Sequence, residues 1–148
     1  MRFLIQRVKK ASVSVNGQVK GAIEHGFLVF VGVREGDGQA EADKLIKKLL
    51  GLRIFEDENG KTNLSLSDVD GSLLIVSQFT LYADCKKGYR PSFMKSGDPL
   101  VARNLYEYVV SECKKNNYNV QTGVFGEHME VQLLNDGPFT IWLDSDEL

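Results

Sequence analysis

The stretch Leu73-Leu74-Ile75-Val76-Ser77-Gln78-Phe79-Thr80-Leu81 decides the fold, because an apolar run leads directly into a group of polar side chains. Consecutive apolar residues that include β-branched ones are typical of a buried strand. We therefore expect a central strand over residues 72–80. Ser77, Gln78 and Thr80 would bring hydroxyl and amide groups to the end of that strand, which makes them candidate functional residues.

A second segment, Asn135-Asp136-Gly137-Pro138-Phe139-Thr140, separates two strand-like runs over residues 131–134 and 139–143. Proline has no N–H to donate to a β-ladder, so it belongs at a bulge, a sheet edge or a strand end. Asn, Asp, Gly and Pro are also the residues that dominate turns. Taken alone, this segment predicts a surface turn between two strands.

The other patterns along the chain predict alternating strands and helices without a linker or a repeat. The expected elements are a strand over 3–15 with irregular alternation, a tight turn at Asn16-Gly17, a return strand over 19–23, a buried strand over 27–33, a helix over 42–50, a polar loop over 56–60, an exposed loop over 84–97, a helix that begins at Asp98-Pro99 and ends near Asn116-Asn117, and further strands over 120–143. These elements predict a single α+β domain over residues 1–148. It would be rich in β-structure, with barrel-like antiparallel or mixed sheets and two helices covering one side.

Composition fits an ordinary globular protein of one domain. The chain has 148 residues, 43% of them hydrophobic, and a formal net charge of −2, which does not indicate a nucleic-acid binder. The basic cluster Lys86, Lys87 and Arg90 would permit RNA contact locally. No apolar stretch is long enough to span a bilayer, there is no secretory signal pattern, and Cys85 and Cys113 are spaced like free thiols. We expect a cytoplasmic protein with no membrane partner.

Few residues of the usual catalytic types are present. The only histidines are His25, in a predicted turn, and His128, far along the chain from any serine motif. A Ser-His-Asp set assembled in space stays open, although no G-x-S-x-G pattern occurs. No His, Cys or Asp cluster has the spacing of a metal site. The economical interpretation is chemistry without a metal, a cofactor or a protein imidazole.

Three motifs in this order resemble the D-aminoacyl-tRNA deacylase family. They are Ser77-Gln78-Phe79-Thr80-Leu81, Gly88-Tyr89-Arg90-Pro91-Ser92-Phe93 and Asn135-Asp136-Gly137-Pro138-Phe139-Thr140. The resemblance extends over essentially the whole chain, from Gln6-Arg7-Val8 through Arg53-Ile54-Phe55 to Trp142. It implies a homodimer with the active site at the interface, acting on D-aminoacyl-tRNA and on glycyl-tRNA, and no DNA partner.

The resemblance implies that Ser77, Gln78, Phe79 and Thr80 form the catalytic segment. The backbone N–H groups of Phe79 and Thr80 would bind the carbonyl of the aminoacyl ester, and the 2′-hydroxyl of the tRNA's terminal adenosine would assist the attacking water. Donors aimed at a developing oxyanion contribute about 3–4 kcal/mol in known hydrolases. Thr80 would either orient the substrate or attack it, and a nucleophilic threonine needs a neighbouring base.

For Gly137 and Pro138 the resemblance implies chiral selectivity. The bond between them would be cis and would insert into the pocket of the partner subunit. Its carbonyl oxygens would face the substrate's α-ammonium and exclude the side chain of an L-residue, while a D-residue points outwards. Glycine has no side chain to exclude, so glycyl-tRNA would also be hydrolysed.

The remaining site residues follow from the same resemblance. Supporting roles would fall to Arg7, which braces the Gly-Pro loop, and to Asn135, Thr140, Phe125 and Met129. Glu127-His128 departs from the small residue that the family pattern has after Phe-Gly, which leaves the local pocket lining open. Lys86, Lys87 and Arg90 are candidates for contacts with tRNA phosphates.

Three other functions compete with this interpretation. The first is a non-catalytic RNA-binding dimer, which would need a basic face and aromatic platforms. The second is an interaction protein, in which Thr80 and Gly137 would be dispensable. The third is a deacylase of the same fold with a trans Gly-Pro unit and a different residue specificity.

Overall fold

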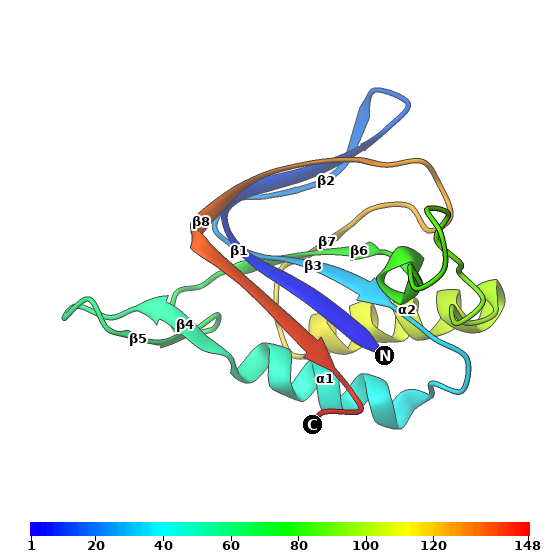
Figure 1. Cartoon of the computed structure of the whole chain (residues 1–148). Coiled ribbons are helices and arrows are strands. Elements are labelled where there is room, and N and C mark those ends of the chain that lie inside the picture. The colour runs from blue at the N-terminus through cyan, green and yellow to red at the C-terminus, as the bar shows by residue number, and fades with distance from the viewer.

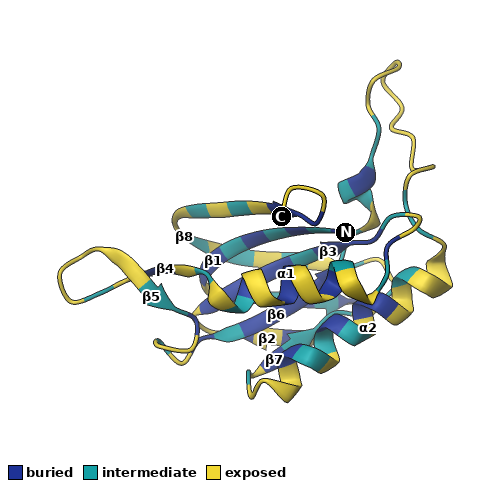
Figure 2. Cartoon of the chain, turned by 90° about the horizontal axis from the view of Figure 1, so that it is seen from below, coloured by how far each residue is buried: buried dark blue, intermediate teal, exposed yellow.

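The computed structural model describes residues 1–148 and has eleven elements (Figure 1). They are β1 (Arg2–Val15), β2 (Gln18–Ile23), β3 (Gly26–Gly32), α1 (Gln39–Gly51), β4 (Arg53–Glu56), β5 (Thr62–Ser65), β6 (Ser72–Ser77), the 3₁₀ turn η1 (Phe79–Tyr82), α2 (Pro99–Lys115), β7 (Val120–Thr122) and β8 (Glu130–Asp144). The predicted α+β class, with two helices on one side of a curled sheet, is confirmed (Figure 2).

One six-stranded sheet forms the body of the molecule, in the order β2-β1-β3-β6-β7, and β8 pairs with β1. β1 is antiparallel to β2, β3 and β8, whereas β3, β6 and β7 run parallel. Parallel neighbours need long crossover connections, and α1 and α2 provide them. β2 also approaches β7 closely enough that a Cβ at Gly21 would lie 2.5 Å from the backbone oxygen of Thr122. The sheet therefore curls into a nearly closed barrel.

The apolar runs of β3 and β6 are continuous because these strands are buried on both faces. Phe27, Val29 and Val31 of β3 belong to the core between the sheet and the helices, while Leu28 faces a smaller core inside the curled sheet. Leu74 and Val76 of β6 also belong to that inner core. The strand that ends at Ser77 is thus held firmly on both sides.

The start of α2 is as the sequence predicts, whereas α1 begins at Gln39, three residues before the expected helix. Asp98 Oδ1 accepts hydrogen bonds from the N–H groups of Leu100 (2.9 Å) and Val101 (3.3 Å), so it is the N-cap of α2. On α2, Leu105, Tyr106 and Val109 lie in the core, whereas Val101 is 45% exposed. None of the helices is long and apolar enough to cross a membrane.

The expected strand over residues 72–80 is too long. β6 ends at Ser77, and the chain then tightens into η1, whose N–H groups at Leu81 and Ala83 donate to the carbonyls of Gln78 and Thr80. The hairpin of β4 and β5 around the predicted polar loop was not expected. By contrast, the turn at Asn16-Gly17 is confirmed, with φ of 50° and 77° as a two-residue hairpin turn requires.

Candidate active site

A pocket of about 580 Å³ lies where β6 gives way to η1. Five of the residues that line it were predicted as site residues. They are Ser77, Gln78 and Phe79 at the strand end, together with Phe125 and Met129. The remaining lining comes from Val76, from the loop before α2 and its first turns, and from residues 126–131. The packed parallel strands thus place polar strand-end groups at the wall of a largely apolar cavity.

The start of η1 supplies free backbone donors beside this pocket. A 3₁₀ turn leaves its first N–H groups without an acceptor inside the turn, and here these belong to Phe79 and Thr80. The Gln78 N–H is used differently, because it donates to the carbonyl of Val31 at 2.8 Å. This segment is therefore anchored to β3, and its next two N–H groups have no acceptor inside the turn. Phe79 lines the pocket, whereas Thr80 lies just outside its lining.

The side chains of the same segment are also held in place. The amide Nε2 of Gln78 donates to the hydroxyl of Thr80, and the hydroxyl of Ser96 donates to the carbonyl of Phe79 at 3.2 Å. The rings of Phe79 and Phe93 pack edge to face with centroids 5.0 Å apart. The bond from Gln78 is the one side-chain hydrogen bond of the Thr80 hydroxyl, which no carboxylate, imidazole or amine joins.

Two residues that sequence reasoning left unassigned, Glu127 and His128, also line the pocket. The tertiary fold brings His128 to the same cavity as Ser77, although no hydrogen bond joins them. Only the departure from the family pattern after Phe125-Gly126 pointed to this position. No group of three or more His, Cys, Asp or Glu side chains lies close enough together to hold a metal ion.

Tyr106 of α2 is a further residue that sequence reasoning missed. Its hydroxyl donates to the carbonyl of Ile75 at 2.8 Å, two residues before Ser77, and β7 stops pairing with β6 at this point. Burial raises the pKa of Tyr106 to about 12, so the hydroxyl keeps its proton and remains a donor. Tyr106 thereby satisfies a buried carbonyl two residues before the predicted catalytic segment.

Gly137 and Pro138 lie on a bulge of β8. A bulge is one of the few places in a sheet where proline, which has no N–H to donate, is tolerated. Gln6 pairs with Thr140 and Val8 with Asn135, so residues 136–139 of β8 oppose the single residue Arg7. The bond between Gly137 and Pro138 is cis, as the resemblance implied. Both residues are exposed in the single chain.

Arg7 and Asn135 hold this bulge, and both were predicted to support it. The guanidinium of Arg7, which is 7% exposed, donates to the carbonyl of Asp136 (2.9 Å) and to that of Ile54 on β4. The amide of Asn135 donates to the carbonyls of Arg7 (3.0 Å) and Phe139 (3.1 Å). The hydroxyl of Thr140, next along β8, accepts a hydrogen bond from Gln6 (3.3 Å).

The bulge and the pocket lie apart within one chain. Figure 1 shows the bend of β8 beside β4, at the end of the molecule away from η1. No residue from 132 to 140 lines the pocket. The candidate tRNA-contact residues Lys86, Lys87 and Arg90 are exposed on the loop that leads to Phe93 at the pocket. The structure therefore brings Ser77, Gln78, Phe79, Phe125 and Met129 together around one pocket, whereas Thr80 and the predicted selectivity residues lie outside its lining.

The fold and site define a class of small α+β proteins with a pocket lined by main-chain donors at a strand end. The family model described as D-Tyr-tRNA(Tyr) deacylase matches residues 4–144. A D-aminoacyl-tRNA deacylase of Thermosipho africanus is 55% identical over 148 residues, covering 100% of this chain and 99% of that protein. That of Aquifex aeolicus is 51% identical and covers 100% of both chains. The chain belongs to the D-aminoacyl-tRNA deacylase family.

Solved structures support the same fold. A structure described as the c-Myc DNA unwinding element binding protein has a TM-score of 0.91 and 38% identity, covering 97% of this chain and 98% of that one. A probable eukaryotic D-amino acid tRNA deacylase has a TM-score of 0.81 over 96% of this chain and 97% of that one. With 19% identity, the second likeness shows the fold alone.

Proposed function

We propose that this protein hydrolyses the ester bond between a D-amino acid and the 3′ adenosine of tRNA. Membership of the deacylase family supports this activity. The observation that carries it within the structure is the start of η1, where the N–H groups of Phe79 and Thr80 are free of acceptors in the turn beside the pocket. An activated ester needs a stabilised oxyanion and a positioned water more than a strong base.

In this mechanism the ester carbonyl accepts hydrogen bonds from the two main-chain donors, and the charge that develops on its oxygen strengthens them. Ser77 and Gln78 keep the strand end in register, and the Gln78 amide orients the hydroxyl of Thr80. The 2′-hydroxyl of the terminal adenosine assists the attacking water. Lys86, Lys87 and Arg90 meet phosphates of the tRNA from the exposed loop.

Selectivity for the D-configuration is assigned to Gly137 and Pro138 of a second copy of the chain. The separation of the bulge from the pocket supports a shared site, because a single chain does not bring the two together. The exposed outer side of β8 carries apolar side chains, with Leu134 48% exposed and Trp142 43% exposed. Such a surface fits an interface between two copies. The homodimer and its cytoplasmic location stay predictions.

The wild-type protein is expected to hydrolyse several D-aminoacyl-tRNAs at similar rates and to hydrolyse glycyl-tRNA as well. The matched L-esters are expected to react about 10³-fold more slowly, equivalent to about 4 kcal/mol in the transition state, because the L side chain would overlap the Gly137-Pro138 unit. Release of labelled amino acid from D-tyrosyl-, L-tyrosyl- and glycyl-tRNA measures this. Equal hydrolysis of both enantiomers would overturn the filter, and binding without turnover would favour the RNA-binding alternative.

The Thr80→Ala variant distinguishes an orienting hydroxyl from a nucleophile. The main-chain donors survive this change, so kcat is expected to fall by about tenfold or less, the scale of one lost neutral hydrogen bond. Single-turnover kinetics with D-tyrosyl-tRNA measures the effect, with Thr80→Ser as the control that keeps a hydroxyl. Complete loss of turnover with intact tRNA binding would instead make Thr80 the nucleophile.

A further inference from the structure

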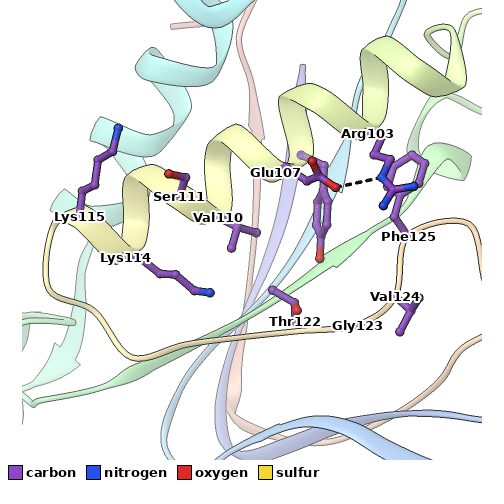
Figure 3. Close-up of a pocket in the computed structure, with 11 residues that line it drawn as sticks. Arg103, Glu107, Val110, Ser111, Lys114, Lys115, Thr122, Gly123, Val124 and Phe125 are labelled. Atoms are coloured by element: carbon purple, nitrogen blue, oxygen red, sulfur yellow. Dashed lines mark hydrogen bonds and ion pairs between the residues drawn. The ribbon is translucent and has the colours of Figure 1, made fainter.

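A second cavity, a groove of about 740 Å³, runs along α2 on the other side of the chain segment that walls the catalytic pocket (Figure 3). Its floor is formed by residues 122–125, and its upper side by one face of α2. Phe125 lines both the groove and the catalytic pocket. The Cβ that Gly123 lacks would lie 2.5 Å from Met129 Sδ, so only one thin segment of chain separates the two cavities.

One face of α2 lines the groove. Arg103, Glu107, Val110 and Lys114 recur at the spacing that puts residues on one helical face, and all but Val110 are charged. Lys114 lies eleven positions after Arg103, which corresponds to about 16 Å along a helix. Arg103 lies at the end beside Phe125, and Lys114 extends across the groove towards its floor (Figure 3).

The charge balance of this face is positive. Glu107 is the only acidic residue in the lining, and its carboxylate is neutralised by Arg103 at 2.9 Å. Lys114 forms no ion pair, whereas Lys115, which also lines the groove, is paired with Glu112. A free ammonium at one end and a guanidinium at the other would suit a ligand that carries regularly spaced negative charges.

We propose that this groove binds the sugar-phosphate backbone of the substrate tRNA next to its 3′ end, with Lys114 and Arg103 as phosphate contacts. The inference rests on the proposed function, because it takes the terminal adenosine to occupy the catalytic pocket. A polymer whose end lies in that pocket can pass over Phe125 directly into the groove. Contacts with phosphate position a nucleic acid without reading its sequence, so this surface would serve many tRNAs alike.

The test compares two substrates that share the ester but differ in length, D-tyrosyl-tRNA and D-tyrosyl-adenosine. The double variant Arg103→Gln/Lys114→Gln is expected to raise KM for the tRNA by about tenfold. It should leave hydrolysis of the short ester within about twofold, because only the longer substrate reaches the groove. A plot of log affinity for uncharged tRNA against log salt concentration has a negative slope. In the double variant this slope should become less steep by about 1.4–1.8, the value expected for the loss of two phosphate contacts.

Two further variants make the result decisive. Glu107→Gln removes the competing carboxylate and frees Arg103, so it is expected to tighten tRNA binding. Lys44→Gln, on the exposed side of α1 and outside every cavity described here, is the matched control and should change nothing. Thermal unfolding checks that each variant is folded.

Equal effects on both substrates, or an effect of Lys44→Gln as large as that of the double variant, would overturn the groove assignment. Unchanged tRNA binding in the double variant would also overturn it. If the wild-type protein hydrolyses neither ester, the proposed function fails, and the binding of uncharged tRNA still decides the groove by itself.

Discussion

The Gly137→Ala variant is expected to lose about 10²-fold in kcat/KM on D-aminoacyl-tRNA, the scale of a displacement of about 1 Å in a positioning group. Gly137 has a φ of +147°, which L side chains rarely adopt. An added Cβ would lie 2.7 Å from the N of Phe139 and 3.1 Å from its Cβ. The backbone of the bulge must therefore move, and the selectivity unit moves with it.

Kinetics of Gly137→Ala on D- and L-tyrosyl-tRNA, beside unfolding in urea, measures this prediction. Gly36→Ala is the matched control, because Gly36 also has a positive φ (+87°) but an added Cβ there meets nothing within 4 Å. It is expected to cost about 1 kcal/mol of stability and no activity. A Gly137→Ala protein as active and as selective as wild type would remove Gly137 from the site.

Replacing Arg7 by alanine is expected to lower the free energy of unfolding by about 3 kcal/mol and to reduce activity at least tenfold. The guanidinium is buried and donates to two carbonyls, those of Asp136 and Ile54, which would be left without a partner. It also lies 4.7 Å from the ring centroid of Phe139 in the bulge. Loss of Arg7 would thus free the bulge from β4.

Arg7→Lys separates the charge of this residue from its geometry. An ammonium is a point donor and does not reproduce the forked guanidinium that reaches two carbonyls at once. The lysine variant is therefore expected to recover only part of the stability. Urea unfolding and deacylation of D-tyrosyl-tRNA check this, and full recovery by lysine would show that charge alone matters at position 7.

Local chemistry was sufficient to predict several elements of the fold. The turn at Asn16-Gly17 and the start of α2 at Asp98-Pro99 were predictable, because each depends on a few neighbouring residues with special backbone preferences. The end of β6 was not, because the change from strand to 3₁₀ turn after Ser77 depends on the bond from Gln78 to Val31 of another strand. Such a contact leaves no pattern in the local sequence.

The candidate site divides in the same way. Residues 77–80, Arg7 and Asn135 were named from motif resemblance. The structure gives a hydrogen bond that involves a side chain to each of them except Ser77, which lines the pocket. Tyr106 was missed and His128 was left without a role, because their positions are set only when α2 and the segment before β8 fold against β6. Periodicity assigns Tyr106 to the helix, but it does not show that its hydroxyl reaches Ile75.

In the bulge, four residues of β8 lie opposite one residue of β1, and this register constrains how many residues the segment can contain. Side chains alternate between faces along a strand, so a shift of one residue exchanges the two faces. Beyond the bulge, Leu143 is buried and Trp142 is 43% exposed. Inserting or deleting one residue between Asp136 and Phe139 would turn Trp142 inwards and Leu143 outwards. A substitution in this segment acts only in and around the bulge. A change in the number of residues would exchange the buried and exposed faces of the whole C-terminal half of β8.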